Sequence, residues 1–276
     1  MGQRKAAALA ATAHPGPSLA VTTLAALLTS AYGGNAALVL GVIVAVLSGQ
    51  LVIGWSNDLI DADRDARDAR GDKPLATGVL TRRFVGIALG AAAVLTVVSS
   101  LTLGAVAGLL HLVLVVGSGL AYNLGLKATV LSFVPYALAF GALPAVGWYA
   151  VQGQPAASAP VEGAPPAWML VVGALLGVGA HLLNALPDLQ QDQAHGIHGL
   201  PHRLGAALVQ LIAPALLLVG AVTAVVVPAG PVSWWGGGIT AAALVLAVVA
   251  GTSKGMWPFR AAIGIALLAV AALLAG

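Results

Sequence analysis

Six aspartates lie between positions 58 and 72 of a chain in which only 8% of the residues are charged. At about 100° per helical residue, Asn57, Asp61 and Asp65 point within about 80° of one another, and Asp58 lies about 100° from Asn57. Asp63 points to the opposite side of the same helix. Carboxylates gathered in this way repel one another unless a cation lies among them, and oxygen ligands favour Mg²⁺ over softer metals. The pattern therefore predicts a magnesium-binding face.

A second acidic stretch repeats the spacing of the first. A shift of 127 positions pairs Asn57 with Asn184, Asp61 with Asp188 and Asp65 with Asp192, without a gap. This weak internal repeat predicts two parallel copies of Asn-x-x-x-Asp-x-x-x-Asp, each at the end of a helix. Asp58 ranks below the other aspartates as a ligand, because Ala185 takes its place in the second copy. Two facing stripes would hold two or more Mg²⁺ ions with positions open for phosphate oxygens.

The elements that position these residues are predicted to be membrane helices. The chain has 276 residues, 59% of them hydrophobic, and its mean hydropathy of +0.98 indicates more apolar surface than a soluble core of this size buries. The absence of cysteine excludes disulfides and thiolate ligands. A helix needs about 17 to 25 apolar residues to cross a bilayer. We expect nine such spans, at 16–32, 36–56, 82–102, 104–122, 130–151, 167–187, 205–228, 233–250 and 257–275.

The basic residues predict the orientation of these spans. Nine spans place all 12 Lys and Arg on one side, which the positive-inside rule assigns to the cytoplasm. We therefore expect an all-α integral protein of the plasma membrane, with a cytoplasmic N-terminus and residues 1–276 forming one domain. Both acidic stripes would then open to the cytoplasmic side. The charge pattern indicates a lipid bilayer as surroundings and no nucleic-acid partner.

These motifs resemble those of the UbiA superfamily of intramembrane prenyltransferases. The matching residues are Asn57, Asp58, Asp61 and Asp65 for the first family motif, Asp188 and Asp192 for the second, and Tyr122 and Lys127 for the tyrosine-and-lysine loop motif, here "YNLGLK". One departure is His14-Pro15, where many members enter the first span with Arg-Pro. The resemblance covers nearly the whole chain. It implies a helical bundle around a central cavity and Mg²⁺-dependent transfer of an isoprenyl group from its diphosphate to an aromatic or other lipophilic acceptor.

The implied chemistry suggests roles for further residues. Metal ions held by carboxylates would neutralise the departing diphosphate, and cationic side chains would assist them. The substrate-binding residues expected on this basis are Asn57, Asn184, Arg64, Lys73 and Arg203, beside a catalytic set of Asp61, Asp65, Asp188, Asp192, Tyr122 and Lys127. An allylic cation needs shielding from water and contact with π faces. Phe133, Tyr136 and Phe140 form one aromatic stripe, which either lines the prenyl tunnel or packs in the core.

Other interpretations remain open at this point. Asp61, Asp63 and Asp65 alternate as in a calcium loop, but Ala66 stands where that loop requires glycine. Three histidines, His195, His198 and His202, could bind a metal, although a position beside a phosphate site is more typical of them. A terpene cyclase of the same superfamily would use the same metal site, and a branch of the superfamily uses a phosphoribosyl donor. An ion-coupled transporter is disfavoured because the acids lie at one membrane face.

Overall fold

The computed structural model of the protein describes residues 2–68, 70–153, 161–194, 196–228 and 233–275. All regular secondary structure in these ranges is helical, which confirms the expected all-α fold. The α-helices are α1 (Gly2–Ala11), α2 (Pro15–Ala31), α3 (Ala36–Arg67), α4 (Arg82–Thr102), α5 (Ala105–Leu110), α6 (Gly117–Asn123), α7 (Val134–Gln152), α8 (Ala167–Ala185), α9 (Leu189–Ala194), α10 (Leu200–Val226), α11 (Trp234–Thr252) and α12 (Trp257–Ala275). A π-helical segment, η1 (His111–Val116), joins α5 to α6, and 3-10 segments are η2 (Leu126–Ala128), η3 (Val130–Phe133) and η4 (Leu186–Asp188).

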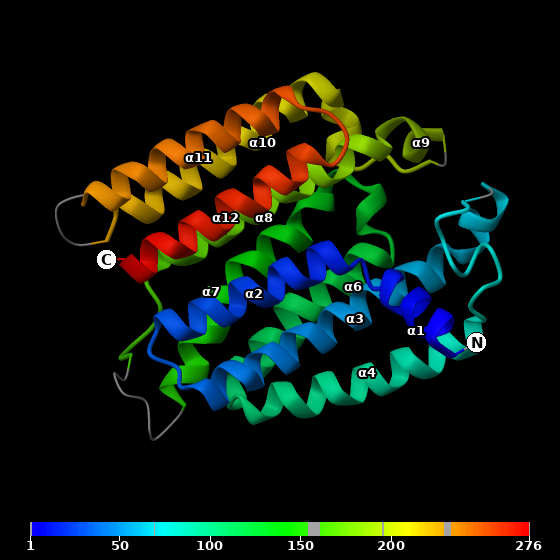
Figure 1. The fold of residues 1–276 in the computed structure, drawn as a ribbon, viewed down its shortest axis with the longest axis horizontal. Coiled ribbons are helices and arrows are strands. Elements are labelled where there is room, and N and C mark those ends of the chain that lie inside the picture. Colours follow the sequence, from blue (N-terminus) through cyan, green and yellow to red (C-terminus); the bar gives the residue numbers. More distant parts are fainter. Residues whose placement is uncertain (1, 69, 154–160, 195, 229–232, 276) are drawn as a thin grey trace.

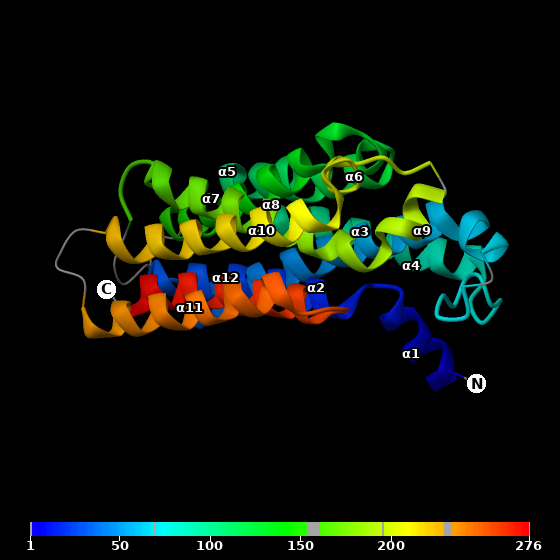
Figure 2. The ribbon, with the colours of Figure 1, turned by 90° about the horizontal axis from the view of Figure 1, so that it is seen from above.

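The long helices lie side by side in one bundle, with their axes along the long dimension of the molecule (Figures 1 and 2). Helix α2 packs against α3, α7 and α12, while α7 packs against α8. Helix α10 contacts α8, α11 and α12, and α4 packs against α3. Helices that are distant in sequence, such as α2 and α12, are therefore neighbours in the bundle.

Among the described residues, seven helical segments are long and apolar enough to cross a membrane: 36–67, 82–102, 105–123, 130–152, 167–188, 200–226 and 234–252. The other two expected spans form shorter helices in the same bundle, namely α2, of 17 residues, and α12, whose apolar part is described over Trp257–Ala272. Large apolar side chains point outward from several helices, as at Ile87, Leu211 and Val245, which are 65%, 68% and 63% exposed. Such surface is stable in lipid, and the protein is a multi-pass membrane protein.

One long continuous helix and two local breaks shape one end of the bundle. Helix α3 continues past the expected boundary at residue 56 as far as Arg67, so the first acidic stretch is helical. Pro187 lies between α8 and α9, where it has no N–H to donate and crowds the carbonyl four residues earlier. Helix α10 begins at Leu200 and is kinked at Gly205, whose φ of 75° favours glycine.

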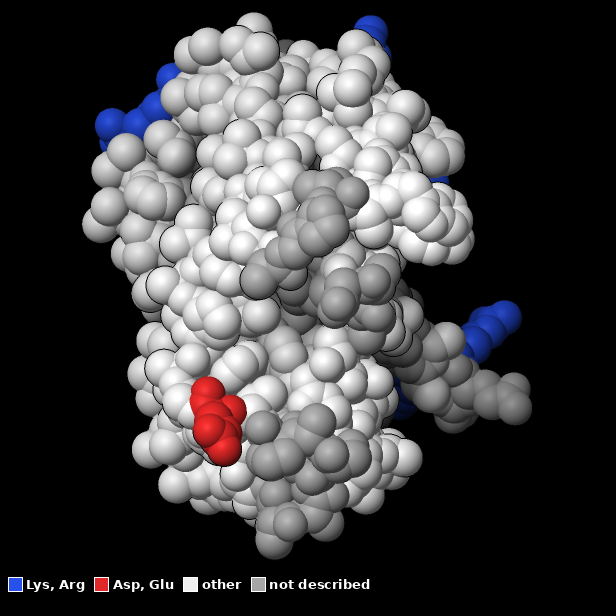
Figure 3. All heavy atoms as spheres, turned by 90° about the vertical axis from the view of Figure 1, so that its left-hand side faces the viewer, with Lys and Arg blue, Asp and Glu red and all other residues white. Residues whose placement is uncertain are grey.

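Charge is concentrated at the same end of the bundle. The end of α3, the loop that follows it and α9 lie at the right-hand end of Figure 1. The opposite end, seen in Figure 3, is almost uncharged, with one small acidic patch and basic atoms only at its margins. Of the nine acidic residues in the sequence, only Glu162 lies outside the stretches 58–72 and 188–192.

Candidate active site

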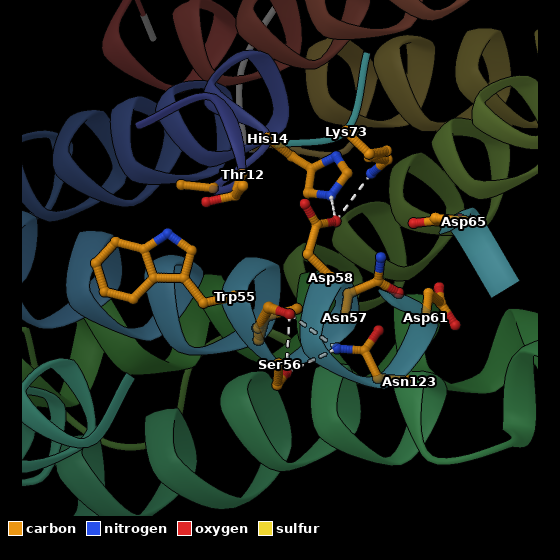
Figure 4. A network of polar contacts seen from close by, with 12 residues as sticks. Thr12, His14, Trp55, Ser56, Asn57, Asp58, Asp61, Asp65, Lys73 and Asn123 are labelled. Carbon is orange, nitrogen blue, oxygen red and sulfur yellow. Dashed lines mark hydrogen bonds and ion pairs between the residues drawn. The ribbon is translucent and has the colours of Figure 1, made fainter. Parts of the chain in front are cut away.

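The acidic residues that the helical spacing places on one face of α3 are buried in the structure. Asp58, Asp61 and Asp65 are only 2%, 7% and 4% exposed, and Figure 4 shows them along the last turns of the helix. Asp63, which the spacing places on the opposite side, is solvent-exposed and forms an ion pair with Arg82 of α4. Buried carboxylates are costly unless they are paired, so the cations around this face determine its chemistry.

Lys127 Nζ lies among three oxygen atoms of α3. It donates to both carboxylate oxygens of Asp61, at 2.8 and 2.7 Å, and lies 3.5 Å from the side-chain oxygen of Asn57. Arg64 Nη2 contacts the same Asp61 carboxylate at 2.9 Å and Asp65 Oδ1 at 3.8 Å. An ammonium group enclosed in this way shows that Asn57 and Asp61 can surround a cation. Their oxygen atoms are the ligands that Mg²⁺ requires, so this part of the site fits the predicted metal.

Asp58 is engaged by groups outside α3. Lys73 Nζ donates to Asp58 Oδ1 at 2.8 Å, and His14 Nε2 lies 3.2 Å from the same oxygen (Figure 4). His14 directly precedes α2 and has a left-handed backbone conformation, with φ of 49°, which is uncommon for a residue other than glycine. The residue that departs from the family's Arg-Pro pattern thus binds Asp58. Asp58 thus links the segment before α2 to the loop after α3.

The second acidic stretch is not one continuous helix. Asn184 lies in the last turn of α8, Asp188 ends η4 and Asp192 lies on α9. The structure differs here from the sequence prediction that both copies lie at a helix end, because Pro187 interrupts the helix. Asp188 is solvent-exposed. Asp192 is half-buried, and burial raises the pKa of its carboxyl group.

The basic side chain beside the second acidic stretch is a histidine, whereas lysine and arginine side chains contact the first stretch. Nε2 of His202, a buried residue of α10, lies 3.4 Å from Asp192 Oδ2. His198 is exposed, and His195 lies outside the described residues. Of the three histidines, His202 is therefore the one that the structure shows next to a residue of the second acidic stretch.

The two acidic stretches lie near each other at this end of the bundle, since Asn57 and Asn184 line the same cavity. Arg64 of α3 lowers the pKa of Asp192 against the effect of burial, and Arg70 interacts electrostatically with Asp188. Arg203 does not join them, because its Nε donates to the carbonyl oxygen of His198 at 3.1 Å and its side chain is exposed. Within the described part of the chain, no three Asp, Glu, His or Cys side chains are close enough to hold a metal ion as they stand. The Asp61 carboxylate is instead paired with Lys127 and Arg64.

A cavity of about 250 Å³ lies next to the acidic groups. Asn57 and Asn184, one from each acidic stretch, both line it. Most of the remaining wall is apolar and comes from α2, α3, α7, α8 and α12. The cavity therefore joins a polar, cation-binding end to a hydrocarbon-like interior, in the arrangement expected of a central cavity.

Aromatic rings form one side of this cavity. The Tyr136 ring stacks on that of Phe140, with centroids 6.4 Å apart, and meets the Tyr122 ring edge-on at 5.3 Å. All three rings line the cavity, whereas Phe133, the first member of the predicted aromatic stripe, is not among its lining residues. Phe133 ends η3, before α7 begins, so it does not share the helical register of the other two.

Two cavity-lining residues were not identified from the sequence. His14 was noticed only as a departure from a motif, although it contacts Asp58. Gln50 precedes Asn57 by seven residues and lies on the same face of α3, where it lines the cavity. A polar residue inside an apolar span is a signal of function, and the seven-residue spacing would have located Gln50.

The membrane bundle, the two acidic stretches and the apolar cavity beside them are the features expected from the resemblance to intramembrane prenyltransferases. The UbiA prenyltransferase family matches residues 18–260, and the chain belongs to this family. The protein is therefore a prenyltransferase. No protein of curated function matches the chain.

Several solved structures share the fold at low sequence identity. A UbiA homologue from Aeropyrum pernix K1 is 18% identical, with a TM-score of 0.72 over 94% of this chain and 96% of its own. A homologue from Archaeoglobus fulgidus bound to GPP and Mg²⁺ is 16% identical, with a TM-score of 0.68 over 97% and 98%. A structure of digeranylgeranylglyceryl phosphate synthase is 14% identical, with a TM-score of 0.68 over 99% and 98%. These similarities establish the UbiA membrane fold.

Proposed function

We propose that this protein transfers an isoprenyl group from an isoprenyl diphosphate to an aromatic or other lipophilic acceptor, with Mg²⁺ as its cofactor. The observation that carries the proposal is the meeting of two acidic stretches, on α3 and on α8 to α9, beside an apolar cavity. A diphosphate would lie at the acidic end and its hydrocarbon chain in the cavity. The Archaeoglobus fulgidus homologue, solved with GPP and Mg²⁺ and with DMAPP and Mg²⁺, supports this assignment by analogy.

The acidic residues would hold the metal through oxygen atoms only. The proposed ligands are Asn57, Asp61 and Asp65 from the first stretch and Asp188 and Asp192 from the second, with Asp58 in a supporting position. Bound Mg²⁺ would supply neutralisation of the charge that develops on the leaving diphosphate. Asn184 lies at the cavity wall and would donate from its amide to a phosphate oxygen.

Cationic side chains change partners in this proposal. Lys127 now binds Asp61 and would release it to donate to a diphosphate oxygen when the carboxylate takes up metal. Arg64 reaches both Asp61 and Asp65 and would contribute in the same way. Lys73 is retained by Asp58 and would hold the loop after α3 over the site. Arg203 would reach a phosphate only after its side chain turns away from His198.

The aromatic side of the cavity would accommodate the reacting end of the donor. Tyr122 and Tyr136 present ring faces and edges to an interior from which apolar walls exclude water. Such rings stabilise an adjacent cation, and a dry site protects it from capture by water.

The far end of the cavity would limit the length of the donor. A second cavity of about 40 Å³ lies beyond the first, and the residues that line both are Leu24, Phe140, Leu143, Leu176 and Ala266. Phe140 is held in this wall by α8, since a Cβ atom at Gly177 would lie 2.6 Å from the Phe140 Cβ. We assign this wall as the floor of the prenyl slot. Phe133, which lies outside both linings, remains a weaker candidate for chain-length selection.

The proposed orientation follows from charge alone. The Lys and Arg residues favour a cytoplasmic location for the acidic end, and hence for the entry of a water-soluble diphosphate. The acceptor would enter from the bilayer, the plasma membrane in this proposal, because it is lipophilic. Residues 1–276 would act as one prenyltransferase domain.

The proposal is tested by product analysis with purified protein in lipid. Geranyl, farnesyl and geranylgeranyl diphosphates are supplied with Mg²⁺, with and without a panel of phenolic and quinone-precursor acceptors, and products are identified by mass spectrometry. Diphosphate release and a prenylated acceptor are expected, with both lost in Asp61→Ala and Asp188→Ala. A cyclised hydrocarbon formed without acceptor would overturn acceptor transfer in favour of a cyclase, and no Mg²⁺-dependent binding of any prenyl diphosphate would overturn the donor assignment.

A further inference from the structure

Gln50 is a polar side chain in the middle of an apolar helix. It belongs to the Ala36–Arg67 segment, one of the seven segments apolar enough to span a membrane, and it lines the 250 Å³ cavity. Gly54 and Asn57, four and seven residues further along α3, line the same cavity. The Gln50 side chain is therefore on the substrate-facing side of the helix, well away from the charged end.

Several other polar side chains of the bundle are satisfied by the protein itself. The hydroxyl of Ser48, on the same helix, donates to the carbonyl oxygen of Ala45 at 3.0 Å. Ser18, which shares the cavity wall, donates to the carbonyl oxygen of Ala13 at 2.6 Å, and the Asn123 amide donates to Ile53 and Ser56. The Gln50 amide has no hydrogen-bond partner among the described residues. An amide left unpaired in an apolar setting is costly, so its retention points to a ligand.

The depth of Gln50 limits which ligand group can meet it. Seven residues at about 1.5 Å each place Gln50 about 10 Å from Asn57 along the helix axis. The diphosphate and the carbon that it leaves both belong at the level of Asn57. Beyond that carbon the donor is a hydrocarbon chain, which neither donates nor accepts a hydrogen bond. A polar group at the depth of Gln50 must therefore belong to the other substrate.

We propose that Gln50 determines acceptor specificity by hydrogen bonding to an oxygen-bearing group of the acceptor. This inference rests on the proposed prenyl transfer. Because the reacting atom of the acceptor lies near the diphosphate, the group that meets Gln50 is a second one, remote from the reacting atom. The acceptor class is a lipophilic molecule with a hydroxyl or carbonyl oxygen on the side away from its site of prenylation. The primary amide can serve either kind of oxygen, since it both donates and accepts.

The test compares matched acceptors on matched variants. Ring acceptors are assayed in pairs that differ only in an oxygen remote from the reacting atom, such as 6-acetyl-1-naphthol and 6-ethyl-1-naphthol, which differ in a carbonyl oxygen on the second ring. The wild-type protein is compared with Gln50→Met, which keeps the length of the side chain without its amide. Ser48→Ala is the control, because that hydroxyl is used within its own helix. Binding of geranyl thiolodiphosphate with Mg²⁺ is measured on each protein.

We expect the wild type to favour the acceptor with the remote oxygen and Gln50→Met to reduce that preference, measured as a ratio of kcat/KM values, about tenfold. Donor binding should not change, and Ser48→Ala should keep the wild-type ratio. An unchanged ratio in Gln50→Met, or turnover only of acceptors that lack the remote oxygen, overturns the inference while donor binding stays intact. Loss of Mg²⁺-dependent donor binding in the wild type would instead defeat the proposed function itself.

Discussion

The two copies of the acidic repeat have the same spacing but very different surroundings. The copy on α3 lies on one continuous helix, and its three aspartates on the inner face are buried and paired with Lys73, Lys127 and Arg64. The copy on α8 to α9 is interrupted at Pro187, leaves Asp188 exposed and has His202 beside Asp192. Sequence similarity between repeats thus does not extend to their packing.

This difference suggests a division of labour. The first copy is fixed by its helix and by ion pairs, so it forms a rigid wall of the site. The second copy lies on short segments after a proline and, among the described residues, makes fewer polar contacts, so we expect it to adjust when metal and diphosphate enter. We therefore expect changes in the first copy to affect both stability and catalysis, and changes in the second to affect catalysis chiefly.

The largest expected effect comes from Asp61→Asn. The substitution removes a proposed ligand and leaves the partly buried cations Lys127 and Arg64 without their main partner, so diphosphate release should fall about a thousandfold. Asp188→Asn should cost less, because Asp188 is exposed and binds neither cation. Rates are measured by steady-state release of diphosphate. Asp63→Asn is the control on the opposite side of α3, and equal losses in Asp61→Asn and Asp188→Asn would remove the proposed asymmetry.

Stability should respond most to Lys73→Met. Asp58 is 2% exposed, and without Lys73 its buried charge keeps only His14, so unfolding should become easier by about 3 kcal/mol. Reversible unfolding in mixed micelles gives this value, and the double change Lys73→Met with Asp58→Asn should recover much of the loss. Arg82→Met, which breaks the exposed pair with Asp63, should change little. A comparable loss of unfolding free energy in Arg82→Met would show that burial does not explain the effect of the Lys73–Asp58 pair.

A smaller effect is expected from Pro187→Ala. The alanine restores a backbone donor and allows α8 to continue, which would turn Asp188 away from its present direction. We expect kcat to fall about tenfold with the folded state at least as stable as before. Pro166→Ala, at the other end of α8, serves as the control. Wild-type turnover in Pro187→Ala would mean that the break has no part in aiming the second copy.

The smallest expected effect concerns the apolar end of the cavity, away from the two acidic copies. Phe140→Ala would join the 250 and 40 Å³ cavities, so the preference for geranylgeranyl over geranyl diphosphate should rise about fivefold. Competition between the two donors measures the ratio. Phe133→Ala, outside both linings, should leave it unchanged. If only Phe133→Ala shifts the ratio, the floor of the slot lies elsewhere.

Much of the site followed from spacing within single helices. That Asp58, Asp61 and Asp65 share one face of α3, with Asp63 on the other side, follows from a residue interval of about 100°. The burial of that face depends on the segments packed against it. The resemblance of "YNLGLK" to a family motif implied a role for Lys127, but it did not indicate that Lys127 binds Asp61 directly. That contact joins segments 66 residues apart, which only packing brings together.

The sequence by itself determined that the chain is a membrane bundle, that its charged residues gather at one end and that the acidic motif occurs twice. These properties follow from composition and periodicity, which act locally along the chain. The tertiary structure decided which cation meets which carboxylate, and that Phe133 lies outside the cavity while Gln50 lines it. These features depend on how helices distant in sequence pack against one another, and close contacts such as that of Gly177 with Phe140 set that packing. Local spacing contains no information on such distances.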